Sequence, residues 1–153
     1  MSNRLSFLWW ALLFAAFFSC TNLKVNKESF NFSGELRVFH YNSMPQINKP
    51  YANGTPLSTT VYIYEPTKIT QLDSLNGSYC KKNNARLVAK IQSNTLGNFN
   101  TFLKPGKYSV FVAYENALFV PFFSGANWAS LIEIKPLGTC NLKINVMGNS
   151  NSQ

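Results

Sequence analysis

The chain has 153 residues, a length typical of one domain, and carries a formal net charge of +8. Its basic residues are scattered, and Lys81-Lys82 is the one adjacent basic pair, so the charge forms no basic run of the kind that nucleic-acid binding requires. Composition therefore predicts a single small domain with a basic surface and argues against nucleic acid as a partner.

The first residues have the pattern of a secretory signal. Arg4 supplies a positive charge, and residues 5–18 are uncharged, with Ser6 as the one polar interruption. This run is too short for an ordinary membrane-spanning helix, which needs about 20 residues. We therefore expect an N-terminal signal helix over residues 1–19. The alternatives are a buried helix and a single membrane anchor.

The residues that follow resemble the bacterial lipobox, in which a small residue precedes a cysteine that becomes acylated. Ser19 lies directly before Cys20, although Phe17 stands where the family prefers Leu. The resemblance implies that Cys20 is the lipid attachment site, and that the membrane is reached through this lipid anchor. Thr21 rather than Asp follows the cysteine, which implies the outer membrane. An acidic cluster typical of surface export is missing there, so we expect the periplasmic face, with surface exposure as the alternative.

Removal of residues 1–19 takes away Arg4 alone among the charged residues, so the mature chain has a net charge of +7. Its first residues are polar and irregular, and its last are rich in Asn and Ser. This pattern predicts a lipid-anchored tether over 20–33, a domain over 34–147 and a disordered tail over 148–153.

The domain shows strand signals throughout. Segments rich in Val, Ile, Phe, Tyr and Thr alternate with clusters of Gly, Pro and Asn, and no segment has the apolar spacing of an amphipathic helix. We expect strands over 35–41, 59–64, 86–92, 99–103, 108–114, 117–123, 130–134 and 141–146, of which 117–123 has a buried loop as its alternative. Lys104-Pro105-Gly106-Lys107 is expected to form a type II turn. Together these segments predict an all-β sandwich of seven to eight strands.

Residues 88–112 resemble a signature of carboxypeptidase regulatory-like domains, D-x-x-G-x-F followed by L-x-P-G-x-Y-x-V. Asn94 stands where the family often has Asp, and the matching residues are Gly97, Phe99, Leu103, Pro105, Gly106, Tyr108 and Val110. Met44-Pro45 and the segment T-V-Y-I-Y-E-P-T over 60–67 further resemble small Bacteroidetes-type lipoproteins with such a domain. The resemblance implies a transthyretin-like (prealbumin-like) or Ig-like β-sandwich and says little about function.

The residue types needed for catalysis are sparse. His40 is the single histidine and lies in an expected strand, so a serine triad or a grouped zinc site lacks its usual members. The carboxylates are scattered, and there is no P-loop, dinucleotide-binding or G-x-S-x-G motif. We therefore expect a non-enzyme with no catalytic residues, no metal and no cofactor.

Two cysteines remain in the mature chain after Cys20. Cys80 and Cys140 could form a disulfide in an oxidising compartment. It would close a loop of about 60 residues and contribute roughly 4 kcal/mol on the chain-entropy model. Two free thiols are the alternative.

Aromatic residues and one short motif are the remaining candidates for contacts. Trp128 lies in a turn-like segment, and Tyr62 and Tyr64 share a face of one strand, so they could stack on sugar rings. Trp128 could instead cover one end of the sandwich. Asp73-Ser74-Leu75 resembles the O-glycosylation acceptor of Bacteroidetes, which implies Ser74 as a glycan site.

These observations leave two hypotheses about function. The first is a non-catalytic, membrane-anchored lipoprotein whose sandwich is a binding or structural module of the cell envelope, contacting envelope proteins or glycans. The alternative is an accessory lipoprotein that binds a carbohydrate or small ligand through Trp128 and nearby aromatic residues.

Overall fold

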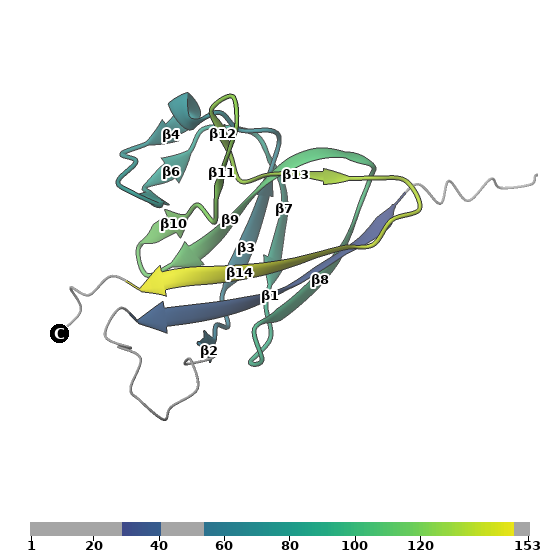
Figure 1. Cartoon of the computed structure of the whole chain (residues 1–153), viewed down its shortest axis with the longest axis horizontal. Coiled ribbons are helices and arrows are strands. Elements are labelled where there is room, and N and C mark those ends of the chain that lie inside the picture. The colour runs from purple at the N-terminus through teal and green to yellow at the C-terminus, as the bar shows by residue number, and fades with distance from the viewer. Residues whose placement is uncertain (1–28, 41–53, 149–153) are drawn as a thin grey trace, which may run out of the picture.

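The computed structural model describes residues 29–40 and 54–148. Within these ranges the chain forms an all-β sandwich (Figure 1), which confirms the predicted fold class. The expected signal helix, Cys20, Met44-Pro45 and most of the tether and tail lie outside the described residues.

The first sheet is built around β1 (Phe30–His40), which pairs in parallel with β14 (Cys140–Gly148). On its other side β1 pairs antiparallel with β8 (Asn98–Leu103) and β2 (Thr55–Pro56). The first and last described strands therefore lie side by side. β1 begins at Phe30 rather than at residue 35, because Phe32 is fully buried and belongs to the core.

The second sheet has β9 and β3 at its centre and contains most of the predicted strands. Its order is β5-β10-β9-β3-β7, and β13 also pairs with β9. The bounds are β5 (Tyr79–Cys80), β10 (Ala117–Phe119), β9 (Gly106–Tyr114), β3 (Thr60–Tyr64), β7 (Leu87–Gln92) and β13 (Leu131–Ile134). Gly106 is already the first residue of β9, with φ of 156°, so the type II turn expected there is wrong.

The main core lies between the two sheets. Alternation along each strand places one set of apolar side chains inside, as period-2 patterns require. Phe32 and Phe99 contact each other across the strand pair with ring centroids 5.4 Å apart. The other buried members are Leu36, Val38, Val61, Ile63, Leu103, Val110, Val112, Phe119, Ile134, Ile144 and Val146.

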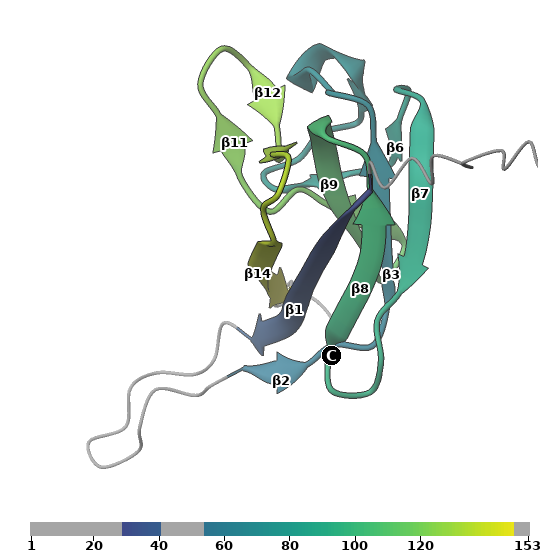
Figure 2. The ribbon, with the colours of Figure 1, turned by 90° about the vertical axis from the view of Figure 1, so that its right-hand side faces the viewer.

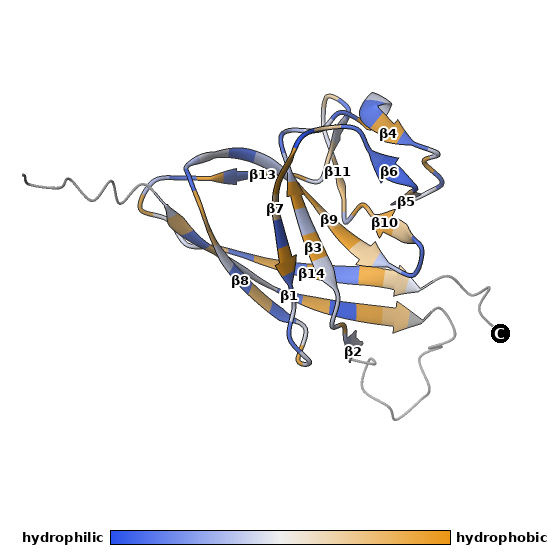
Figure 3. Cartoon of the chain, turned by 180° about the vertical axis from the view of Figure 1, so that it is seen from behind, coloured by the Kyte–Doolittle hydropathy of each residue, from blue (hydrophilic) through white to orange (hydrophobic). Residues whose placement is uncertain are grey.

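A small lobe covers the outer face of the second sheet and is built mostly from segments that lie between the expected strands. It consists of η1 (Ile69–Gln71), β4 (Leu72–Asp73), β6 (Lys82–Asn83), β11 (Phe123–Ser124) and β12 (Trp128–Ala129). Its own apolar cluster contains Tyr64, Cys80, Phe111, Val120 and Ala129. Because β9 is thus covered on both faces, it is apolar along most of its length (Figure 3). The expected strand over 117–123 is divided between β10 and β11.

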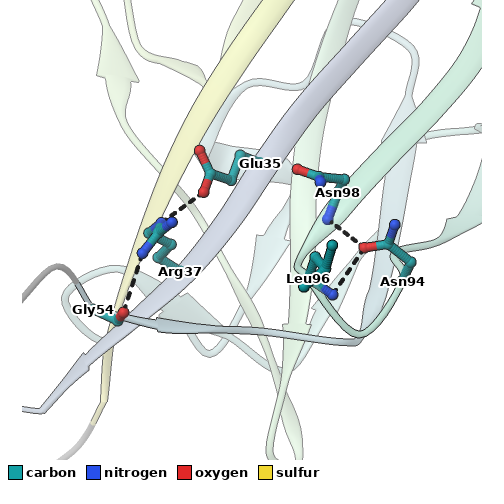
Figure 4. Close-up of polar contacts among 6 residues, drawn as sticks. All are labelled: Glu35, Arg37, Gly54, Asn94, Leu96 and Asn98. Carbon is teal, nitrogen blue, oxygen red and sulfur yellow. Dashed lines mark hydrogen bonds and ion pairs between the residues drawn. The ribbon is translucent and has the colours of Figure 1, made fainter.

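The turn between β7 and β8 is closed by Asn94, the residue that stands in the Asp position of the signature. Its Oδ1 accepts hydrogen bonds from the backbone N–H groups of Leu96 at 3.0 Å and Asn98 at 2.9 Å (Figure 4). Gly97 follows with φ of 79°, and its carbonyl accepts a hydrogen bond from Leu36 at 2.8 Å. The turn therefore joins β8 to β1 and holds the two sheets together.

Candidate functional site

The open side of the sandwich lies where the two sheets each end in an edge strand. Among the described strands β7 pairs only with β3, and β8 pairs only with β1. These two edge strands follow each other in the chain but belong to different sheets (Figure 2). Edge strands present unpaired backbone groups and are common sites of recognition.

A groove opens on this side, at the end of β7 and β8 that is remote from their connecting turn. It has a volume of about 650 Å³. Its lining comes from β7, β8, the start of β9 and the segments that precede them: Glu65, Pro66, Arg86, Val88, Ala89, Phe102, Leu103, Lys104, Gly106, Lys107 and Tyr108. Ligand sites are typically concave, with apolar walls and a few polar groups. The lining of this groove likewise contains apolar and polar side chains.

The apolar part of the groove is exposed to solvent. Phe102 keeps 67% of its surface exposed and Val88 keeps 41%. Tyr108 is half-buried, and its hydroxyl donates a hydrogen bond to the carbonyl of Lys104 at 3.0 Å. This bond fixes the tyrosine ring against the β8–β9 turn. The groove thus offers one fixed ring and one exposed ring for stacking.

The polar part of the groove is mainly cationic. Arg86 forms an ion pair with Glu65, at 2.6 Å between Nη2 and Oε1, and both side chains are well exposed. Such an exposed pair contributes at most about 1 kcal/mol, so a ligand can displace it. Lys104 and Lys107 lie at the rim and are exposed. Glu65 is the one carboxylate among the lining residues, and none of them is a histidine or cysteine.

The aromatic residues expected to contact a ligand lie elsewhere. Tyr64 is 9% exposed and packs edge-on against Phe111, with ring centroids 5.5 Å apart, so little of its ring is accessible for stacking on a sugar. Tyr62 is half-buried beneath Lys90, whose Nζ lies 5.7 Å from the ring centroid. The lobe covers this face of the sheet, and periodicity alone did not show that a lobe was present.

Trp128 belongs to the lobe. It is half-buried in β12, and Nζ of Lys68 lies 5.5 Å from the centroid of its ring. Backbone pairing between Lys68 and Trp128 holds the two residues together. A cation over an indole ring is an attractive contact, so Trp128 has a structural role in joining the two halves of the lobe.

Cys80 and Cys140 are both free thiols, so the disulfide does not form. The Tyr79 hydroxyl donates to the carbonyl of Met147, near the end of β14, whereas Cys140 begins that strand. A strand of this length spans roughly 25 Å or more, and a disulfide needs Cα atoms within about 7 Å. Burial raises the pKa of the Cys80 thiol to about 11, with a smaller contribution from Asp73, and burial also raises the pKa of Cys140.

Ser74 lies on the outer side of the lobe and is exposed. Its Oγ donates a hydrogen bond to Oδ1 of Asp73 at 3.1 Å, and its φ is 52°. The hydroxyl is therefore on an accessible turn, as the glycosylation hypothesis requires.

The described part of the chain has no group of three or more histidine, cysteine or acidic residues that could hold a metal ion. Over the same residues, no helix has the length and apolar character needed to cross a bilayer.

Comparisons with known proteins assign no family to this chain. No family model matches the chain, and no curated protein matches it. It is similar to the solved structure of a DUF3823 family protein from Parabacteroides merdae, with 13% sequence identity and a TM-score of 0.39. The match covers 77% of this chain and 45% of the Parabacteroides merdae chain. This chain therefore spans less than half of the length of that protein.

Proposed function

We propose that this protein is a non-catalytic, lipid-anchored β-sandwich of the bacterial cell envelope, and that the groove between β7 and β8 is its ligand-binding site. The observation that carries the binding role is the groove itself, in which one exposed and one half-buried aromatic ring lie beside cationic side chains. The membrane address rests on the lipobox-like residues before Cys20. As before, we expect the outer membrane and its periplasmic face.

The chemistry of the groove favours an anionic carbohydrate. Phe102 and Tyr108 offer apolar ring faces on which a sugar ring can stack. Lys104 and Lys107 offer charge to a carboxylate or phosphate, and Arg86 can turn from Glu65 to bind one in bidentate fashion. An acidic glycan as ligand is compatible with both functional hypotheses from the sequence, because such glycans can be part of the cell envelope or free in solution.

The absence of a reacting group in the groove supports a binding role over a catalytic one. General acid–base hydrolysis of a glycan uses a pair of carboxyl groups, and the lining contains Glu65 alone. A sugar held against Phe102 and Tyr108 would therefore be bound without being cleaved.

The binding role is tested by calorimetric titration of the mature protein with acidic and neutral oligosaccharides. We expect the acidic series to bind, and Phe102→Ser and Lys107→Glu each to weaken binding at least about tenfold, because each removes one element of the groove. Lys143→Glu is the control, since this exposed lysine lies on β14, away from the groove lining. Equal affinity in all three variants would show that the ligand binds elsewhere.

The membrane address is tested by the intact mass of protein extracted from membranes, together with palmitate labelling. We expect a chain that begins at Cys20 and carries diacylglycerol, and a Cys20→Ala variant without label. A chain that retains residues 1–19 and carries no lipid would contradict the anchor.

A further inference from the structure

Three segments far apart in the sequence meet at one end of the sandwich. The register pairs Phe30 with Leu103, Phe32 with Cys140, and Ile134 with Gly106. The start of β1, the β8–β9 turn and the β13–β14 turn therefore lie at the same end, on the right in Figure 1. This is also the end at which the chain arrives from residues 20–29.

The β13–β14 turn carries an apolar side chain in an unusual position. Gly138 N–H donates to the Lys135 carbonyl at 3.3 Å, with Pro136 second and Leu137 third in the turn. Leu137 has φ of 62°, a left-handed conformation for which such turns normally use glycine or asparagine. Its side chain is nevertheless 95% exposed, so no packing within the described chain explains a leucine there. A strained residue kept at an exposed site points to a contact outside the chain.

The same end is positively charged. Lys104 and Lys107 flank the β8–β9 turn, Lys135 begins the β13–β14 turn, and all three are exposed. Two carboxylates lie near these lysines: Glu133, which pairs across the strands with Lys107, and Glu65 of the groove, which is neutralised by Arg86. We call Lys104, Pro105, Lys107, Lys135 and Leu137 the anchor-end surface. The positive charge of this surface and its exposed leucine are complementary to a partner that has an anionic surface and an apolar interior.

The chain between Cys20 and β1 places this surface close to the bilayer. Residues 20–29 can span at most about 35 Å when fully extended, and a flexible chain of that length averages about 18 Å. A lipid on Cys20 would therefore hold the start of β1, and the turns beside it, within reach of the headgroups. Tethering converts a weak surface contact into an intramolecular one with a high effective concentration.

We propose that the anchor-end surface docks on the anionic bilayer to which the protein is attached, with Leu137 inserted among the headgroups and the three lysines in contact with anionic lipid. The inference rests on the proposed lipid anchor. Docking fixes the orientation of the domain, so that β1 and β14 run away from the membrane. Because Lys104 and Lys107 also line the groove, the groove then opens close to the headgroup layer.

The docking is tested by tryptophan fluorescence in the lipidated protein, reconstituted in vesicles of brominated phosphatidylcholine with a quarter phosphatidylglycerol. Leu137→Trp is compared with Leu96→Trp, both in a Trp128→Phe background. Leu96 is a matched control because it is also an exposed leucine in a turn, 64% exposed, but at the opposite end of β8. We expect brominated lipid to quench the tryptophan at position 137, and to leave the tryptophan at position 96 as bright as it is in vesicles of unbrominated lipid.

A second measurement does not depend on the lipid. The mature chain from residue 20, with Cys20→Ser, contains every residue of the described fold. We expect it to sediment weakly with anionic vesicles and not with neutral ones, and to lose binding as salt is raised. Leu137→Asp should reduce the partition coefficient about tenfold, and Lys135→Glu several-fold, whereas Leu96→Asp should have no effect.

The outcomes separate the two proposals. Equal quenching at positions 137 and 96 in a protein that floats with the vesicles would overturn the docking and leave the anchor intact. A protein that carries no lipid and does not float would overturn the anchor. In that case a loss of vesicle binding in unlipidated Leu137→Asp would support the docking, and unchanged binding would overturn it.

Discussion

Asn83 donates a hydrogen bond from Nδ2 to Oγ1 of Thr67 at 3.1 Å, and both side chains are buried between the lobe and the second sheet. Thr67 Oγ1 in turn donates to the Glu65 carbonyl at 2.8 Å, and its backbone N–H donates to Oγ of Ser109 in β9 at 3.0 Å. These hydrogen bonds connect the lobe to the centre of the sheet, and they provide partners for the buried polar groups of Asn83 and Thr67.

We therefore expect Asn83→Ala to lower the free energy of unfolding by about 1–3 kcal/mol, because it leaves buried partners unsatisfied. Asn84→Ala, at the exposed neighbouring position, should change it by less than about 0.5 kcal/mol. Urea unfolding followed by circular dichroism measures both. Equal effects of the two substitutions would show that the network does not stabilise the lobe.

Gly97 and Gly77 form a second matched pair, since both adopt positive φ, of 79° and 56°. A Cβ at Gly97 would lie 2.3 Å from the carbonyl oxygen of Leu36, whereas a Cβ at Gly77 meets nothing within 4 Å. Both alanine variants carry the left-handed strain, of about 1 kcal/mol. We expect Gly97→Ala to cost about 2–4 kcal/mol more than Gly77→Ala, because it also separates β8 from β1. A similar loss in both would mean that the close approach relaxes without cost.

Local pattern was sufficient to predict most of the sandwich. The strands of the main core alternate buried and exposed residues, and Asn94 and Gly97 mark a turn whose chemistry is local. β1 was predicted to begin at residue 35 because residues 20–33 are mostly polar and were assigned to a tether, although Phe30-Asn31-Phe32-Ser33 already has the alternation of a strand around the fully buried Phe32. The partners of β1 in this stretch are β8 and β14, both distant in the sequence, and sequence pattern does not show such pairing.

The groove and the lobe depend on such long-range pairing, and for that reason neither was predicted. Phe102 and Val88 have the residue types of core positions, but they alternate with the more buried Leu103 and Ala89 and lie on outer faces that the described chain leaves exposed. Tyr64 was expected at the surface because it alternates with Ile63, but the lobe covers that face as well. The single polar motif that the pattern did locate, Asp73-Ser74, lies on an exposed turn.

Burial of Cys80 makes the free energy of unfolding depend on pH in the alkaline range. Its pKa is raised from 9.0 to about 11, so the folded state keeps the thiol protonated where the unfolded chain would ionise it. The unfolded state then binds fewer protons, and stability must fall as pH rises from about 9 to about 11. Below pH 9 both states are protonated and the contribution of the thiol is complete.

We expect Cys80→Ala to show a shallower loss of stability across this interval than the parent, measured as urea midpoints at successive pH values. Tyr79, whose pKa is raised to about 12 chiefly by burial, is present in both proteins, so its own contribution cancels in the comparison. Identical slopes of the urea midpoint against pH in the parent and in Cys80→Ala would contradict this prediction. Alkylation of the unfolded, unreduced mature protein should also modify both Cys80 and Cys140, since the two thiols are free.

The final prediction separates the groove from the aromatic residues of the lobe. If Trp128 were the sugar platform, Trp128→Phe would weaken binding of an acidic oligosaccharide, and Tyr108→Ala would not. The structure leads us to expect the reverse, because Lys68 covers the ring of Trp128 while Tyr108 lines the open groove. Loss of a stacked ring should cost about tenfold or more in affinity, measured by calorimetric titration.

Stability needs a control here, because Tyr108 also packs against the main core and its hydroxyl bonds to Lys104. Tyr108→Phe keeps the ring and removes only the bond to the turn, so it should bind nearly as well as the parent while Tyr108→Ala does not. Binding that survives Tyr108→Ala but is lost in Trp128→Phe would move the site from the groove to the lobe. The ligand would then be recognised by the face that the sequence first indicated.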